Sequence, residues 1–168
     1  MSFIAKLQGD GMSRPPRPAN NAIAKAWIGA VLAIAAVAWA ATSTQTALVL
    51  GSFGASCVLV FGFPDLPFSQ PRNVALGHIL SSLTGLLFLT LFGPAWWSMA
   101  LAAGTAIALM MATGTVHPPA GSNPVIVFLA QPGWGFLLFP TAFGIAILLA
   151  VALVYNNVSR EGRYPKYW

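Results

Sequence analysis

Charged residues are scarce in this sequence: they make up 7% of its 168 residues, against about a quarter in a typical soluble protein. Between Lys25 and Arg160 the only formally charged side chains are Asp65 and Arg72. This scarcity excludes a soluble domain, whereas a hydrophobic fraction of 57% is typical of a chain that lies in lipid. Because helices satisfy their own backbone groups in lipid, the sequence predicts an all-α integral membrane protein whose main partner is the bilayer.

Cysteine is nearly absent, since Cys57 stands alone and cannot form a disulfide within the chain. The sequence also lacks a carboxylate pair, a cluster of metal ligands and a nucleophile with an adjacent base, and Asp65 and Glu161 are predicted to lie near surfaces. We therefore expect no enzymatic activity, no cofactor and no metal. The net charge of +5 comes from the two ends of the chain, which indicates cytoplasmic anchoring and not nucleic-acid binding.

These patterns divide the chain into three parts. Residues 1–23 form a basic, proline-rich tail that we expect to be flexible, residues 24–156 form the membrane domain, and residues 157–168 form a basic, aromatic tail. A signal peptide ending near residues 38–40 is an alternative for the first apolar run. We set it aside because the run is long and the following chain needs a partner span. The expected location is a bacterial cytoplasmic membrane with both termini in the cytoplasm.

Apolar segments recur along the middle of the chain. Six are predicted, at about residues 24–41, 47–63, 73–92, 96–116, 124–130 and 136–155. If all six cross the membrane, the basic tails and Arg72 lie on one side, which agrees with the positive-inside rule. If the second and fifth segments are re-entrant, only four cross and Arg72 moves to the outside. The sequence favours six crossings.

The most unusual stretch is the octapeptide His117–Pro124, which separates two apolar runs. Two consecutive prolines oppose an α-helix, whereas Asn123 followed by Pro124 is typical of a helix N-terminus. The helix that would begin there ends at Gln131-Pro132-Gly133, so it is too short to cross a bilayer. We therefore expect a half-helix whose N-terminus points into the protein at membrane depth.

An internal repeat relates this half-helix to the second segment. Shifted by 67 residues, Gly54–Phe61 falls on Gly121–Phe128 with glycine, two valines and phenylalanine identical, and Ser56 falls on Asn123 as a second candidate cap. The second segment is expected to be interrupted at residues 51–56, which would make it a half-helix as well. Three segments in each repeat would make the two halves inverted if six cross, and parallel if four cross.

Two half-helices that meet in the membrane would offer a binding site for a small anion. Helix N-termini carry partial positive charge and unpaired amides, here expected at residues 55–59 and 122–126. The candidate substrate-binding residues are Ser52, Gly54, Ala55, Ser56, His117, Gly121, Ser122 and Asn123. The glycines could instead serve helix packing and the serines could bond to carbonyls of their own helix.

Histidine supplies the titratable chemistry. His117 could add a hydrogen-bond donor or a proton, because histidine changes charge near physiological pH. His78 lies within the third segment, where an ionisable group marks a functional candidate, although it could also be a neutral histidine bonded to a carbonyl. Arg72 and Asn73 are candidate entrance groups; Arg72 could instead reach the headgroups or pair with Asp65.

Several motifs together resemble the HPP family of integral membrane proteins. They are His-Pro-Pro-Ala-Gly at 117–121, Gly-Ser-Phe-Gly-Ala-Ser at 51–56, Gln-Pro-Arg-Asn at 70–73 with His78, and the terminal Arg-Tyr-Pro-Lys-Tyr-Trp. The resemblance covers residues 24–168. It implies four membrane helices, where the pattern above favours six, and nitrite transport, which some plastid and cyanobacterial members perform. The stretch 122–124 departs from the small, apolar residues usual for the family at this place.

From these patterns we predict a transporter or channel for a small inorganic anion, with nitrite as the best guess. The alternative is a membrane scaffold or sensor whose basic tails bind a partner. Six segments enclose little space for a pathway, so a homo-oligomer is expected, with a dimer ahead of a trimer.

Overall fold

All regular secondary structure in the described residues, which are 13, 15–45 and 50–168 of this computed structural model, is helical. Its α-helices are α2 (Asn20–Thr44), α3 (Gly51–Gly62), α4 (Pro71–Phe92), α5 (Trp96–Ala112), α6 (Asn123–Ala130) and α7 (Phe143–Ser159). Shorter helical turns are η1 (Pro67–Ser69), η2 (Pro118–Ser122), η3 (Trp134–Leu137) and the π-helical η4 (Leu138–Ala142). The prediction of an all-α protein is confirmed, and each of the six expected segments corresponds to one α-helix.

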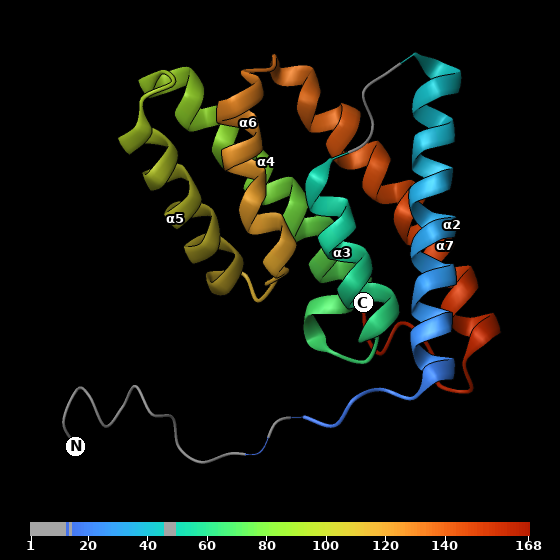
Figure 1. Ribbon diagram of the computed structural model, residues 1–168. Coiled ribbons are helices and arrows are strands. Elements are labelled where there is room, and N and C mark those ends of the chain that lie inside the picture. Colours follow the sequence, from blue (N-terminus) through green and yellow to red (C-terminus); the bar gives the residue numbers. More distant parts are fainter. Residues whose placement is uncertain (1–12, 14, 46–49) are drawn as a thin grey trace, which may run out of the picture.

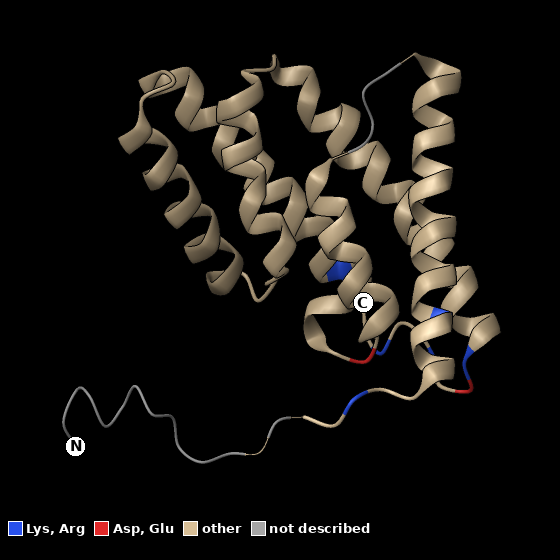
Figure 2. Ribbon diagram, in the orientation of Figure 1, with Lys and Arg blue, Asp and Glu red and all other residues tan. Residues whose placement is uncertain are grey.

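Successive helices run in opposite directions through the bundle (Figure 1). Helix α2 begins at the end of the bundle where the C-terminus also lies, and α7 returns to that end. The charged residues of the described part of the chain gather toward that end too (Figure 2). An alternating chain with charge at one end is the arrangement that a positive-inside membrane protein requires.

Three helical stretches are long and apolar enough to cross a membrane: Asn20–Thr44, Pro71–Phe92 and Trp134–Ser159. Helices α3 and α5, with 12 and 17 residues, are shorter apolar helices. At about 1.5 Å per residue, α3 rises about 18 Å, less than the hydrocarbon thickness of about 30 Å.

Proline and glycine mark several helix ends. Pro71 starts α4, where its missing N–H costs no helical hydrogen bond. Gly93 and Gly114 follow α4 and α5 with φ values of 72° and 63°, a backbone region that favours glycine. Phe139 interrupts the last long helical stretch with φ −129° and ψ 116°, and Pro140 follows it. The stretch 134–159 is therefore kinked near its beginning.

The structure corrects several expected boundaries. Helix α2 begins at Asn20, before the expected residue 24, and α3 is continuous from Gly51, so residues 51–56 do not interrupt the second segment. Residues 47–49 lie outside the described part of the chain. The prolines after His117 form the 3₁₀ turn η2 and not an irregular loop, because proline suits the first positions of a helical turn.

Glycines allow α4 to approach its neighbours closely. A Cβ atom on Gly85 would lie 2.9 Å from Pro124 Cα in α6, and one on Gly77 would lie 2.9 Å from His117 Cβ. Any larger side chain at these positions would separate α4 from the residues around η2 and α6. Beside this contact, α2, α3, α4 and α7 enclose an apolar core that includes Val37, Phe53, Val60, Val74, Leu148 and Ala152.

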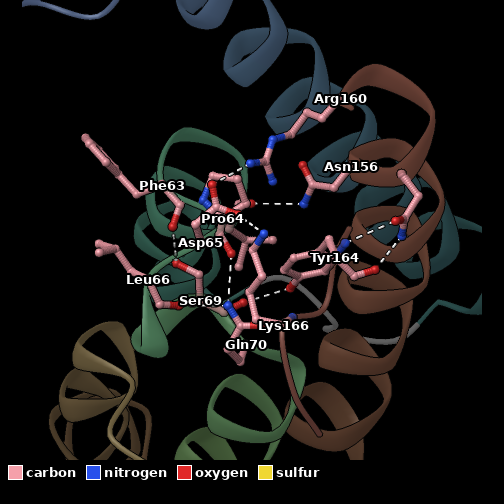
Figure 3. A network of polar contacts seen from close by, with 12 residues as sticks. Phe63, Pro64, Asp65, Leu66, Ser69, Gln70, Asn156, Arg160, Tyr164 and Lys166 are labelled. Carbon is pink, nitrogen blue, oxygen red and sulfur yellow. Dashed lines mark hydrogen bonds and ion pairs between the residues drawn. The ribbon is translucent and has the colours of Figure 1, made fainter. Parts of the chain in front are cut away.

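The C-terminal tail folds back onto the loop between α3 and α4 (Figure 3). The Tyr164 hydroxyl donates to Ser69 O at 2.7 Å, and the Lys166 amide donates to Gln70 Oε1 at 2.7 Å. Asp65 Oδ2 lies 2.6 Å from Arg160 Nη2, and Asp65 Oδ1 lies 3.1 Å from Lys166 Nζ. We call these six residues the C-terminal clamp. Asp65 therefore pairs with the tail and not with Arg72.

Candidate functional site: a buried histidine cluster

Helix α4 carries a polar face into the interior of the bundle. His78, Ser81 and Ser82 are spaced three and four residues apart, so they share one side of the helix, and all three are fully buried. His78 lies seven residues after Pro71, which corresponds to about 10 Å along the helix. A polar face inside an apolar bundle requires partners for every group, because an unpaired polar group is costly in lipid.

His78 finds these partners on two other helices. Its Nε2 atom lies 3.0 Å from Ser56 Oγ in α3, and its Nδ1 atom lies 3.0 Å from Asn123 Nδ2 at the start of α6. The Phe53 ring packs edge-on against the imidazole, with ring centroids 5.5 Å apart. The two nitrogens of one imidazole thus join α3, α4 and α6.

His117 extends the cluster toward the loop that precedes α4. Its Nε2 atom lies 2.8 Å from the same Ser56 Oγ, and its Nδ1 atom lies 2.6 Å from Phe68 O. A carbonyl oxygen only accepts, so His117 Nδ1 carries a hydrogen and donates it to Phe68 O. In a neutral imidazole Nε2 is then an acceptor, and it receives the Ser56 hydroxyl hydrogen.

The same reasoning gives the donor and acceptor roles of the His78 ring nitrogens. Asn123 Nδ2 donates to His78 Nδ1, so a neutral His78 carries its hydrogen on Nε2 and donates it to Ser56 Oγ. Hydrogen bonds therefore run in one direction from Asn123 through His78, Ser56 and His117 to Phe68 O. We call Ser56, His78, His117 and Asn123 the histidine cluster. It contains no formal charge and leaves no imidazole nitrogen unpaired.

Two buried polar atoms, one beside the cluster and one within it, have no hydrogen-bond partner among the described residues. They are Ser52 Oγ, one turn before Ser56 in α3, and Asn123 Oδ1. Ser56 Oγ also lies 3.0 Å from the carbonyl oxygen of Ser52. For a small polar guest, the unpaired Ser52 hydroxyl can donate or accept a hydrogen bond, whereas the Asn123 amide oxygen can only accept one.

Further hydroxyls surround the Asn123 side of the cluster. Asn123 Nδ2 donates to Ser82 Oγ at 2.9 Å, and Ser82 Oγ lies 3.0 Å from Thr141 Oγ1. Ser81 Oγ donates to Ala120 O at 2.6 Å and so holds η2 against α4. Sequence reasoning missed Ser81, Ser82, Thr141 and the Phe68 carbonyl. The helical spacing of the two serines from His78 would have indicated them.

The structure brings together only some of the predicted site residues. Ser52, Ser56, His78, His117 and Asn123 meet in the interior. Gly54 and Ala55 are exposed on the other side of α3, Gly121 is half-buried without cluster contacts, and Ser122 is exposed and bonds to Pro119 O of its own turn. These four residues do not join the cluster.

Arg72 and Asn73 bind the segment 113–116, which connects α5 to His117. Arg72 Nη1 donates to Gly114 O at 2.9 Å, and Asn73 Nδ2 donates to Val116 O at 3.1 Å. Their contacts position the 113–116 segment against α4. The alternative that Arg72 pairs with Asp65 is wrong. The Arg72 guanidinium donates to the carbonyl oxygens of Gly114 and Thr113, and Asp65 pairs with the C-terminal tail.

The expected anion site is also wrong in its geometry at the amides of residues 55–59. Because α3 begins at Gly51, the amides of residues 55–59 lie inside the helix and are bonded to it. The Asn123 amide donates to Ala120 O of η2. Ser56 and Asn123 are not capping residues: Ser56 lies mid-helix, and Asn123 has helical φ and ψ while its side chain reaches His78. Side chains, and not helix ends, form the polar interior.

The described residues contain no group of three or more His, Cys, Asp or Glu side chains that could hold a metal ion. The interior is thus a hydrogen-bonded site built from two imidazoles, hydroxyls and one amide. With three helical stretches suited to crossing a membrane, the fold and this site define a helical integral membrane protein with a polar interior.

Comparison with known proteins assigns the family. The family model described as the HPP transmembrane region matches residues 15–165, and the chain belongs to this family. Two curated Dictyostelium discoideum proteins, each named as a transmembrane protein, are 34% identical to it over 181 and 180 residues. Each alignment covers the whole chain, which spans 64% and 58% of the lengths of these relatives. No solved structure matches.

Proposed function

We propose that this membrane protein transports a small inorganic anion together with a proton, and that both are handled at the histidine cluster. The cluster contains the only two histidines of the chain, both fully buried within a lipid-compatible helical bundle. Ionisable side chains at such positions mark ion pathways and proton relays, because burying them has a cost that function must offset.

The observation that carries this proposal is the position of the Ser56 hydroxyl. It lies 2.8 Å from His117 Nε2 and 3.0 Å from Ser52 O, so its single hydrogen has two acceptors. In the neutral cluster it donates to His117. If His117 Nε2 takes up a proton, the hydroxyl can turn to Ser52 O and accept from both histidines. The cluster can therefore hold one added proton with every imidazole nitrogen still paired.

A proton in this cluster would make the interior suitable for an anion. No lysine or arginine side chain of the described residues bonds to the cluster, and an uncompensated anion in an apolar interior is very costly. A protonated histidine would neutralise it, and the unpaired Ser52 hydroxyl would donate a hydrogen bond to it. Nitrite, which the family resemblance implies, is the first anion to test.

The helix bounds support the internal repeat as part of this proposal. Shifted by 67 residues, α3 falls on 118–129, which is η2 with α6, and α4 falls on 138–159, which is η4 with α7. Helices α4 and α7 run in opposite directions, as inverted repeats require (Figure 1). The equivalent residues Ser56 and Asn123 both bond to His78, one at each ring nitrogen. The site would then lie where the two repeats meet.

The proposal also covers the topology, location and oligomeric state of the protein. We propose six traversals with both termini cytoplasmic, no enzymatic activity, and a homo-oligomer with a dimer ahead of a trimer. The bacterial cytoplasmic membrane stays a prediction, and the two curated relatives come from Dictyostelium. The scaffold alternative needs basic tails available to a partner, whereas Arg160 and Lys166 are engaged with Asp65. This contact makes the C-terminal tail less available to such a partner.

Nitrite flux into proteoliposomes, with and without a pH gradient, tests the proposal. For the unaltered protein we expect nitrite flux into the vesicles when the outside is more acidic than the inside. His117→Ala and Asn123→Leu interrupt the chain of hydrogen bonds on either side of His78, and each should reduce this flux at least about tenfold. Ser122→Ala is the matched control, because this serine is exposed and bonds only within its own turn. Size-exclusion elution and a thermal unfolding transition must show that each variant is folded.

Two outcomes would contradict the proposal. Flux that is unchanged between about pH 5 and about pH 8, or unchanged in His117→Ala, would remove the histidine cluster from the mechanism. Absence of flux, together with no thermal stabilisation by any anion in a panel of small inorganic anions, would favour the scaffold.

A further inference from the structure

A second polar region lies away from the histidine cluster, at the charged end of the bundle. A cavity of about 580 Å³ opens there between the start of α2, the end of α3 and the end of α7. Its polar wall includes Lys25, Asp65, Asn156, Ser159, Arg160 and Glu161. The proposed transport function uses none of these residues.

An apolar groove adjoins this cavity. It has a volume of about 390 Å³ and runs between α2 and α3, with Ala26, Trp27, Ala30, Cys57 and Val58 among its lining residues. The cavity and the groove share Ala22, Gly62 and Phe63 in their walls, so they are adjacent. A polar compartment next to an apolar one on a membrane-facing surface has the shape of a site for an amphiphile.

Two buried donor atoms in the cavity wall have no acceptor among the described residues. Arg160 uses Nη2 to reach Asp65, while its Nη1 atom is buried without a partner, and the Ser159 hydroxyl is also buried and unpaired. Lys25 forms no ion pair with any described residue. Guanidinium and ammonium groups only donate, so the missing partner is an atom that accepts, such as an anionic oxygen.

The carboxylates of the cavity do not oppose an anion strongly. Asp65 is compensated by Arg160 and Lys166: burial raises its pKa, but hydrogen bonds and charges from both cations together outweigh it and hold the pKa below its ordinary value. Figure 3 shows Arg160 reaching Asp65 beside Asn156, so the ionised carboxylate fixes the guanidinium at the cavity. Glu161 is exposed.

We propose that this cavity binds the phosphodiester headgroup of a glycerophospholipid, with one acyl chain in the groove between α2 and α3. The unpaired donors of Ser159 and Arg160, with Lys25, match phosphate oxygens. The charged end of the bundle is the depth at which headgroups lie, and cationic side chains at that depth attract lipid phosphates. The apolar groove distinguishes a lipid from free phosphate, which needs only the cavity.

Binding of a short-chain phospholipid to the purified full chain in detergent tests this site. The probe is dioctanoyl phosphatidylglycerol, and the controls are dioctanoylglycerol, which lacks phosphate, and inorganic phosphate. We expect the phospholipid to bind about tenfold or more tightly than dioctanoylglycerol, measured by native mass spectrometry and by thermal stabilisation. Inorganic phosphate alone should stabilise the protein much less.

Two variants locate the binding. Lys25→Met combined with Ser159→Ala removes two donors without touching the Arg160–Asp65 pair, and it should reduce phospholipid affinity toward that of dioctanoylglycerol. Gly62→Leu should block the junction of cavity and groove, because a Cβ there meets nothing within 4 Å and the larger side chain has room to enter the shared wall. Gly104→Leu in α5, equally open, lines neither compartment and is the matched control.

Equal binding of the phospholipid and dioctanoylglycerol would overturn the headgroup site. Stabilisation by inorganic phosphate as large as that by the phospholipid would assign the cavity to free anions and overturn the lipid proposal. Phospholipid affinity unchanged in both variants, with their unfolding midpoints in the absence of lipid equal to that of the unaltered protein, would show that the lipid binds elsewhere.

Discussion

The histidine cluster and the C-terminal clamp are both polar networks, but they hold the protein together by different physics. The cluster is fully buried and uncharged, and the hydrogen bonds between its four side chains connect different parts of the chain. The clamp uses two ion pairs, and its central Asp65 side chain is 55% exposed. Exposed ion pairs contribute little because water and salt screen them, whereas a buried group that loses its partner keeps its full desolvation cost. Changes in the cluster should therefore cost more than changes in the clamp.

The largest effect is expected where α4 and α6 touch. Gly85→Val places a side chain against Pro124, whose Cα would lie 2.9 Å from the new Cβ, so the helices must separate and the cluster must open. We expect destabilisation of about 1–3 kcal/mol or loss of folded protein. Chemical unfolding in detergent measures it. The control is Gly104→Val, which meets nothing within 4 Å, and an equal cost there would disprove the packing argument.

Next in size is removal of the oxygen that the two histidines share. Ser56→Ala leaves His78 Nε2 and His117 Nε2 without this partner, at a cost of about 1–3 kcal/mol for unpaired buried groups. Ser122→Ala should have an effect near zero. Unfolding free energies compare the two serines, and similar values would mean that the histidines repair their hydrogen bonds with other groups.

A smaller effect is expected at the buried part of the clamp. Tyr164→Phe removes the hydroxyl that donates to Ser69 O and should cost about 1 kcal/mol. Burial raises the pKa of this phenol, so it stays a donor at physiological pH. Tyr167→Phe is the comparison, since its hydroxyl bonds are longer, at 3.3 and 3.4 Å, and the side chain is exposed. A larger loss in Tyr167→Phe would reverse this ranking.

The smallest effect concerns the pH dependence of the clamp. The pKa of Asp65 is lower in the folded protein than in the unfolded chain. Its contribution is therefore present above the unfolded pKa, about 3.9, and is lost as the pH falls through the folded value. Asp65→Asn should lower stability by no more than about 1 kcal/mol at pH 7 and remove this part of the acid dependence. Hydrogen exchange of residues 160–168 follows it, and unchanged acid dependence would argue against the ion pairs.

Apolar runs were sufficient to predict the helices, because burial in lipid leaves few alternatives to a helix. The sequence predicted the residues of the histidine cluster but not how they interact. Ser52, Ser56, His78, His117 and Asn123 were named from their positions, but the role given to Ser56 and Asn123, capping two half-helices, was wrong. Gly51 can begin a helix as well as interrupt one, and the sequence does not say which. The order of the hydrogen bonds depends on how closely α4 approaches η2 and α6, which only the structure reveals.

The central claim is that the anion and a proton cross together through the histidine cluster. The most direct test is nitrite uptake into proteoliposomes at a fixed pH gradient while the membrane potential is varied with potassium and valinomycin, with an internal pH dye reporting protons. Joint movement of one proton with one anion predicts uptake that follows the pH gradient, acidifies the interior and does not respond to the potential. Uptake that follows the potential without moving protons would contradict it.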